Sequence, residues 1–166
     1  FPLVPVLRLE SSSIHLASQN IDSAEVDAKV SLELSPDWVT ATLQLADIYD
    51  VQNKKVEQLS LLKGALDVNP NQYNLIGYLA DYYLKVKDFQ QARQCLESAL
   101  THTSDYPWAW EKLKDLSIEL EEPELVKTLL EDLVKKSPKN AFLWKVRSEQ
   151  EGDFKTKVMY LQKALE

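Results

Sequence analysis

Apolar residues recur along the chain with helical spacing, in paired segments separated by short polar turns. In residues 72–100, "QYNLIGYLADYYLKVKDFQQARQCLESAL", apolar side chains return every three or four positions on both sides of Lys87 and Asp88. This spacing places them on one face of each helix. The stretch therefore predicts two amphipathic helices joined by a short turn at these two residues.

A period of 34 residues orders the whole sequence. Pro36 and Pro70 are 34 residues apart, Pro138 follows two periods later, and each proline stands at the end of a helix-like run. Proline inside a helix removes a hydrogen bond and clashes with the preceding turn, so it marks helix ends. The missing member of the series falls at Ser104, and a proline appears three positions later, at Pro107.

Apolar and small residues keep the same period at positions that are independent of the prolines. A leucine, a small residue and a tyrosine recur on the first helix of each pair, and a leucine and an alanine recur on the second. The matching residues are Leu45, Leu79 and Leu113; Ala46 and Ala80; Tyr49 and Tyr83; Leu62, Leu96 and Leu130; and Ala65 and Ala99. Small residues on both helices allow their backbones to approach closely.

A pair of helices with these residues and a terminal proline resembles the tetratricopeptide repeat. The resemblance divides residues 1–166, taken as one repeat domain, into pairs at about 5–38, 39–72, 73–106, 107–140 and 141–166. It is clearest in the second and third pairs and weakest in the first, where Arg8 and Ser11 depart from the pattern. The last pair aligns only if about three residues are deleted before "EGDFKTKVMYLQKAL".

The resemblance implies an all-α fold, a right-handed superhelical solenoid of about five antiparallel helix pairs. Each pair buries its apolar face against its neighbours, so stability comes from stacking. Because the sequence begins without Met and ends within a helical run, we expect it to be a fragment of a longer protein.

In the tetratricopeptide fold the first helices line a concave groove that commonly holds a peptide or a partner helix. The ninth position of four successive repeats is acidic here, at Asp47, Asp81, Asp115 and Glu149. We predict that these carboxylates form an acidic ladder for a basic segment, with each exposed ion pair contributing roughly 0.2 to 1 kcal/mol. The alternative is a solvated helix face without a partner.

Other groove positions of the family carry aromatic residues and a glycine. Trp108 and Phe142 occupy equivalent places and are predicted anchors for a partner, whereas Trp110 falls at a core position of the repeat. Gly77 precedes Tyr78, and a glycine inside a helix costs roughly 1 kcal/mol relative to alanine. Its presence serves either the approach of a ligand backbone beside Tyr78 or close helix packing.

Composition narrows the class of partner. The formal net charge of −7 argues against duplex DNA and anionic membranes, and it favours a basic or neutral partner. The single cysteine, Cys95, excludes an internal disulfide and a cysteine-based zinc site, and it fits an intracellular protein, cytoplasmic or nuclear. We see no targeting or transmembrane segment.

Catalytic chemistry has little support in the sequence. His15 and His102 are far apart, the three glycines form no phosphate-binding loop, and no metal-ligand spacing occurs. The run "ESSS" at 10–13 is interpreted as helix-end or surface chemistry. We predict that the protein is not an enzyme and has no catalytic residues, no cofactor and no metal site.

Three other functions of a helical-repeat protein were compared with the sequence: two of them stay open, and the third is disfavoured. The chain can be an assembly module that uses its end helices or convex face, because apolar residues gather at both ends, from Leu3 to Leu9 and from Phe154 to Leu161. The tryptophan followed by an acid in "LWKVRSEQE" is faintly similar to the half-a-tetratricopeptide scaffolds of RNA processing. Members that clamp the acidic tails of chaperones carry asparagine at the ninth position, so the acids found here argue against that use.

Overall fold

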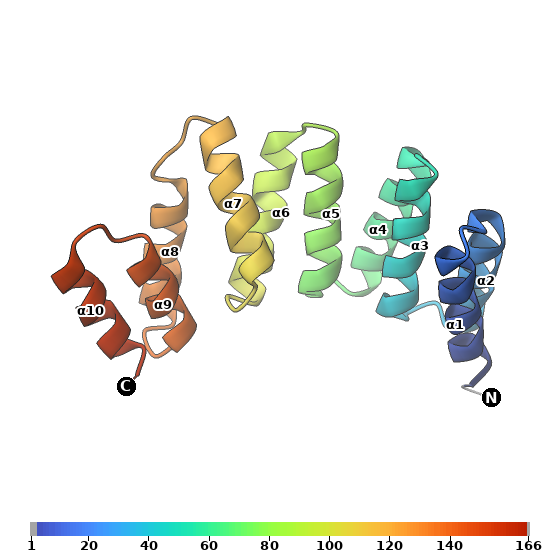
Figure 1. Ribbon diagram of the computed structural model, residues 1–166, viewed down its shortest axis with the longest axis horizontal. Coiled ribbons are helices and arrows are strands. Elements are labelled where there is room, and N and C mark those ends of the chain that lie inside the picture. Colours follow the sequence, from blue (N-terminus) through green and yellow to red (C-terminus); the bar gives the residue numbers. More distant parts are fainter. Residues whose placement is uncertain (1–2, 166) are drawn as a thin grey trace. The chain divides into compact units, whose positions relative to one another are not determined.

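The computed structural model describes residues 3–165, and these residues form ten α-helices and no strand (Figure 1). The helices are α1 (Leu3–Ala17), α2 (Ile21–Leu34), α3 (Val39–Val51), α4 (Lys55–Val68), α5 (Tyr73–Lys85), α6 (Phe89–His102), α7 (Pro107–Glu119), α8 (Leu125–Lys136), α9 (Ala141–Glu149) and α10 (Phe154–Lys163). Odd-numbered helices are the first members of the predicted pairs, and even-numbered helices are the second. The predicted all-α helical-repeat class is confirmed.

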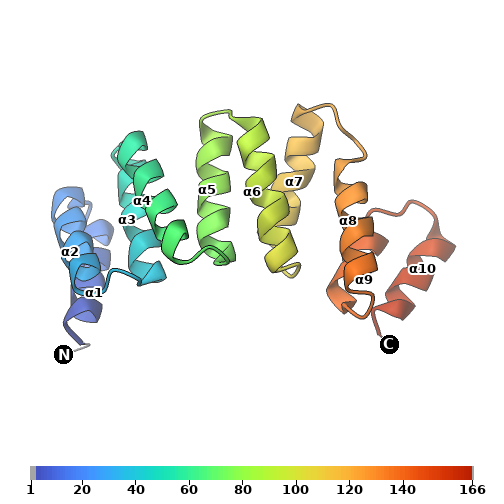
Figure 2. The same ribbon diagram turned by 180° about the vertical axis from the view of Figure 1, so that it is seen from behind.

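The chain forms two compact units, unit 1 up to Tyr82 and unit 2 from Tyr83. In unit 1, α1 packs on α2, α2 on α3, and α3 on α4. Seen from behind, α2 and α4 lie on the near side of α1 and α3 (Figure 2). In unit 2, α6 packs on α7, α7 on α8, α8 on α9, and α9 on α10.

The turns within the pairs repeat the 34-residue period in their backbone geometry. The residues with positive φ are Gln19 (61°), Asn53 (56°), Lys87 (60°) and Glu121 (56°). Each follows a first helix, and the next residue donates back into the last turn; for example, the Lys54 amide donates to the Tyr49 carbonyl at 2.8 Å. These are Schellman caps, and a residue other than glycine in this conformation costs on the order of 1 kcal/mol. The turn predicted at Lys87 and Asp88 is confirmed.

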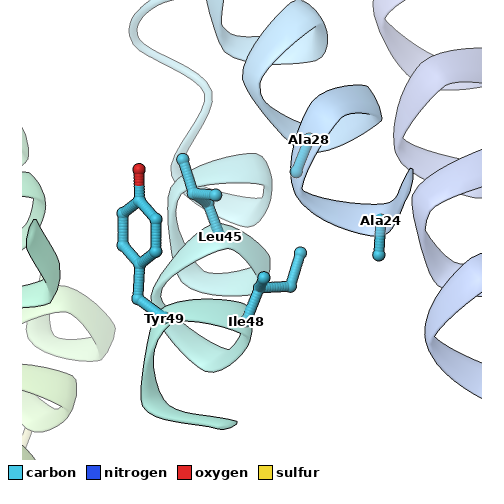
Figure 3. Packing of buried hydrophobic residues seen from close by; sticks show 5 residues of the cluster. All are labelled: Ala24, Ala28, Leu45, Ile48 and Tyr49. Carbon is cyan, nitrogen blue, oxygen red and sulfur yellow. The ribbon is translucent and has the colours of Figure 1, made fainter. Parts of the chain in front are cut away.

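The core of unit 1 joins α2 to α3. Ala24 and Ala28 of α2 are completely buried, and they pack against Leu45, Ile48 and Tyr49 of α3. Figure 3 shows Ile48 pointing from α3 toward the helix that carries the two alanines. The small side chains bring the helices close enough for this contact, as the predicted stripe of leucine, small residue and tyrosine requires.

Polar contacts hold the first pair together, where the repeat pattern is weakest. Ser12 is completely buried and its hydroxyl donates to the Ala24 carbonyl at 2.8 Å. Ser11 and Arg8 both donate to the buried carboxylate of Asp27, Arg8 at 2.7 Å. The interpretation of "ESSS" as surface or helix-end chemistry is therefore wrong for these two serines, because they satisfy groups that the apolar pattern leaves unpaired.

Charge pairs link consecutive helix pairs at equivalent positions with opposite signs. In unit 1, Glu25 of α2 accepts from Lys54 in the next turn at 2.7 Å. In unit 2, Arg93 of α6 donates to Glu122 in the next turn at 2.7 Å. Both members of the second pair lie 68 residues beyond those of the first, so the geometry is kept while the charges are exchanged.

The tryptophans of unit 2 also repeat a contact at the 34-residue interval. The Trp110 indole N–H donates to the Ser104 carbonyl at 2.9 Å, and that of Trp144 donates to the Pro138 carbonyl at 2.7 Å. Trp110 is 3% exposed, which confirms its predicted core position. Ser104, which stands where the repeat pattern expects a proline, thus provides the same backbone carbonyl acceptor as Pro138.

Candidate partner-binding surfaces

First helices of unit 1 are joined by side-chain hydrogen bonds across one face. The Tyr78 hydroxyl of α5 donates to Asp47 Oδ2 of α3 at 3.1 Å. The Ser13 hydroxyl of α1 donates to Gln44 Oε1 of α3, also at 3.1 Å. Each bond joins the ninth position of one pair to the sixth position of the next. We call these four residues the first-helix face of unit 1.

The predicted site residues of unit 1 lie on or next to this face. Asp47 is exposed, Tyr78 and Asp81 are half-buried, and the structure brings Asp47 and Tyr78 into direct contact. Gly77 is buried in α5, which favours helix packing over ligand contact between the two alternatives. The 34-residue period identifies Asp47 as a single acid and does not reveal its contact with Tyr78.

In unit 2 the predicted acids each have a lysine on their own helix. Lys112 Nζ lies 3.7 Å from Asp115 Oδ2 on α7, and Lys145 Nζ lies 3.8 Å from Glu149 Oε1 on α9. Both carboxylates are exposed. Exposed pairs of this kind are weak, but they reduce the negative potential that a ladder of bare acids would create.

The two predicted aromatic anchors of unit 2 are half-buried. Trp108 on α7 lies 5.6 Å from the Tyr106 ring, centroid to centroid. Phe142 on α9 lies beneath the ammonium group of Lys145, which is 5.7 Å from its ring centroid. Each aromatic side chain therefore keeps part of its surface available, and each sits on the same helix as one acid–lysine pair.

The strongest electrostatic perturbation lies away from these surfaces, at Glu25 of α2. Burial raises the pKa of its carboxyl, but hydrogen bonds from Lys29, Lys54 and Gln52 outweigh burial and lower the pKa to about 2. Both lysines also lie within 6 Å of the Tyr49 ring centroid. This cluster ties α2 to the α3–α4 turn and has a structural role.

Metal and membrane chemistry find no support in the described part of the chain. Between residues 3 and 165, no group of three or more histidine, cysteine, aspartate or glutamate side chains is arranged to hold a metal ion. None of the helices in that range combines the length and the apolar character needed to cross a bilayer.

The fold has clear relatives among solved structures. Neither a family model nor a curated protein sequence matches the chain. A crystal structure of MamA is 19% identical, covering 93% of this chain and 92% of that one, with a TM-score of 0.61. A tetratricopeptide-repeat protein from Parabacteroides merdae is 16% identical, covering 98% of this chain and 66% of that one, with a TM-score of 0.65.

A third similar structure is the first tetratricopeptide domain of Spaghetti (RPAP3), bound to the HSP90 peptide SRMEEVD. It is 14% identical, covering 73% of this chain and 96% of that one, with a TM-score of 0.65. At these identities the similarity defines the fold and nothing finer. The chain has the tetratricopeptide-repeat fold, as the 34-residue pattern predicted.

Proposed function

We propose that this chain is a non-enzymatic scaffold that binds a basic segment of another protein along its first helices. The observation that carries the proposal is the pair formed by Asp47 and Tyr78, which places a carboxylate and an aromatic ring together on an accessible face. A guanidinium or ammonium group can pair with the carboxylate and lie against the ring at the same time. Asp81 extends the acidic character along α5.

Unit 2 by itself carries side chains of a similar kind. Asp115 and Glu149 provide charge, and Trp108 and Phe142 provide apolar anchors on α7 and α9. Aromatic side chains that are only half-buried can carry a large share of a binding free energy. A partner segment that alternates basic and apolar residues matches this combination.

The acids argue against an acidic ligand of the type seen with the RPAP3 domain. The peptide SRMEEVD bound there carries three acidic side chains and one basic side chain. A chain of net charge −7 with carboxylates on its first helices would repel such a peptide. Our proposal thus keeps the binding of a peptide segment but reverses the charge of that segment.

Capture from a lysate followed by mass spectrometry tests this function. The bait is compared with a variant in which Asp47, Asp81, Asp115 and Glu149 are changed to amides. A charge-matched control changes Asp67, Asp105, Glu119 and Glu121, which are exposed acids outside the proposed site. We expect basic partners that the first variant loses and the control keeps, and retention by both variants would contradict the proposal.

A second candidate function is assembly through the end helices. No residue of α10 is buried, and its Phe154 is 77% exposed; Leu3 and Leu7 of α1 are 64% and 63% exposed. Apolar surface of this kind favours contact with another protein. A molar mass that rises with concentration, and that falls back in a Phe154→Ser variant, would support this function over the first.

A further inference from the structure

Unit 1 contains an open groove on the side of its second helices. Its walls are α2 and α4, its floor is α3, and its volume is about 840 Å³. In Figure 2 the two walls lie in front of α3, and the floor residues Leu45 and Tyr49 belong to the buried cluster of Figure 3. The groove therefore rests on the packed core of a single unit.

Each wall presents a stripe of residues along one helix. The groove-lining residues at positions i, i+3, i+4 and i+7 of α4 are Leu61, Gly64, Ala65 and Val68. The other wall has Lys29, Leu32 and Glu33 on α2, with Pro36 in the turn that follows this helix. Stripes of this spacing run along a helix for about two turns, and they form the ridges between which another helix packs. The shape of the groove thus suits a helix better than a compact small molecule.

Gly64 gives an independent sign that something approaches this wall. It lies inside α4, and a Cβ atom added there meets no atom within 4 Å. Glycine inside a helix is less favourable than alanine, and no neighbour among residues 3–165 requires its small size. Together with Ala65 it leaves a strip of backbone that another helix can approach closely.

The charges on the rim indicate the chemistry of the occupant. Glu33, Asp37 and Glu57 line the groove and make no hydrogen bond or ion pair within the described residues. The groove's lysine, Lys29, already bonds to Glu25 at 2.6 Å. The rim also has exposed apolar surface at Val56, which lines the groove and is 79% exposed. An apolar face flanked by basic residues is complementary to this lining.

We propose that the groove binds an amphipathic helix of another protein, with its apolar stripe against Leu61, Gly64 and Val68 and its lysines or arginines beside Glu33, Asp37 and Glu57. This site is separate from the first-helix face, and the two can be occupied at the same time. The proposal holds whether or not the first-helix face binds a basic segment.

Titration followed by amide NMR tests the site directly, because the chain has only three glycines. Gly64 reports on the groove, Gly77 on α5 and Gly152 on the α9–α10 turn. The probe is a synthetic 14-residue helical peptide with a leucine stripe flanked by lysines. We expect the Gly64 resonance to move saturably and that of Gly152 to stay. A peptide with glutamates in place of the lysines should bind at least tenfold more weakly.

Substitutions that fill the groove separate binding from folding. Gly64→Leu occupies the open space and favours the helix, so we expect at least tenfold weaker peptide binding, by fluorescence anisotropy, in a variant no less stable than the parent. Gly152→Leu, at the other open glycine, should bind normally. Val56→Ser should weaken binding, whereas Val51→Ser, at a similarly exposed valine outside the groove, should not.

The outcomes distinguish this site from the proposed function. Unchanged affinity in Gly64→Leu, or a Gly64 resonance that does not move, would overturn the groove proposal. Loss of the peptide in an Asp47→Asn, Asp81→Asn variant that keeps an intact groove would also overturn it, because the peptide would then lie on the first-helix face. If basic segments fail to bind the first-helix face, the proposed function is contradicted, but the expected binding of the peptide in the groove does not change.

Discussion

The Tyr78 hydroxyl donates to Asp47 Oδ2 at 3.1 Å and so joins α5 to α3. The same relation recurs one pair earlier, between Ser13 and Gln44, with different chemical groups. The ninth positions of the first two pairs, Ser13 and Asp47, are thus points of attachment for the next pair as well as accessible polar groups. A partner group that binds the Asp47 carboxylate therefore either replaces its hydrogen bond with Tyr78 or binds beside it.

Tyr78→Phe should remove the hydrogen bond and keep the ring. Because the contact is accessible to water, we expect the free energy of unfolding to fall by only about 0.5 to 1 kcal/mol. Urea denaturation of Tyr78→Phe, Asp47→Asn and the double variant measures the coupling between them. Additive losses would show that the pair does not interact in solution.

Acidification should destabilise the protein through Glu25. The pKa of this carboxyl is lowered from 4.5 to about 2 in the folded chain, so its contribution is present above pH 4.5 and is lost as the pH falls toward 2. A lowering of this size corresponds to roughly 3 kcal/mol as an upper figure. Glu25→Gln should flatten the loss of stability between pH 5 and pH 2.5.

The matched control for this pH dependence is Glu33→Gln, an exposed acid of the same helix that makes no ion pair with the part of the chain that the structure describes. It should leave the pH dependence unchanged. Asp27 also has a lowered pKa, because Ser11 and then Arg8 hydrogen-bond to it, so a residual slope remains in Glu25→Gln. Equal flattening by both variants would rule out the Glu25 cluster as the cause.

Lys87→Gly should stabilise the protein. Lys87 has φ of 60° in the turn after α5, where glycine carries no steric penalty. We expect a gain of about 0.5 to 1 kcal/mol in the free energy of unfolding. Lys85→Gly, two residues earlier at the end of α5, should instead lose stability. Destabilisation by both changes would contradict the assigned turn geometry.

The two tryptophans of α7 should respond differently to substitution. Trp110→Phe removes a part-buried hydrogen bond to the Ser104 carbonyl and leaves space around a buried side chain, so we expect a loss of about 1 to 3 kcal/mol in the free energy of unfolding. Trp108→Phe should cost much less stability and should weaken partner binding instead. Thermal and urea unfolding measure the stability of both variants, and partner binding is measured in parallel. A larger loss of stability in Trp108→Phe than in Trp110→Phe would contradict this expectation.

The repeat and its core could be predicted from sequence because they depend on local spacing. Leu45 and Tyr49 are four residues apart, so they lie on one helix face whatever the tertiary structure. Ala24, a small residue, indicates a close contact between helices. The first pair could not be read in this way. Arg8 and Ser11 hydrogen-bond to the buried Asp27 in this pair, and a pattern of apolar residues cannot reveal such a polar contact.

The candidate site was only partly visible in the sequence. Lys145 stands four residues before Glu149, so this pairing could have been found from helical spacing. The contact between Asp47 and Tyr78 joins residues 31 apart and depends on how successive pairs stack. Gly64 stands at a position that the repeat pattern does not define, and its open surroundings become visible only when α2, α3 and α4 are placed in space.

In our proposal, the acids on the first helices select a basic partner by their position. Its most direct test is the Kd of the captured segment for the parent chain, for the four-amide variant of Asp47, Asp81, Asp115 and Glu149, and for the charge-matched control, at low and high salt. We predict at least tenfold weaker binding by the four-amide variant at low salt, a smaller difference at high salt, and a control within twofold of the parent. Equal weakening in both variants would show that net charge alone attracts the partner, and would contradict the account.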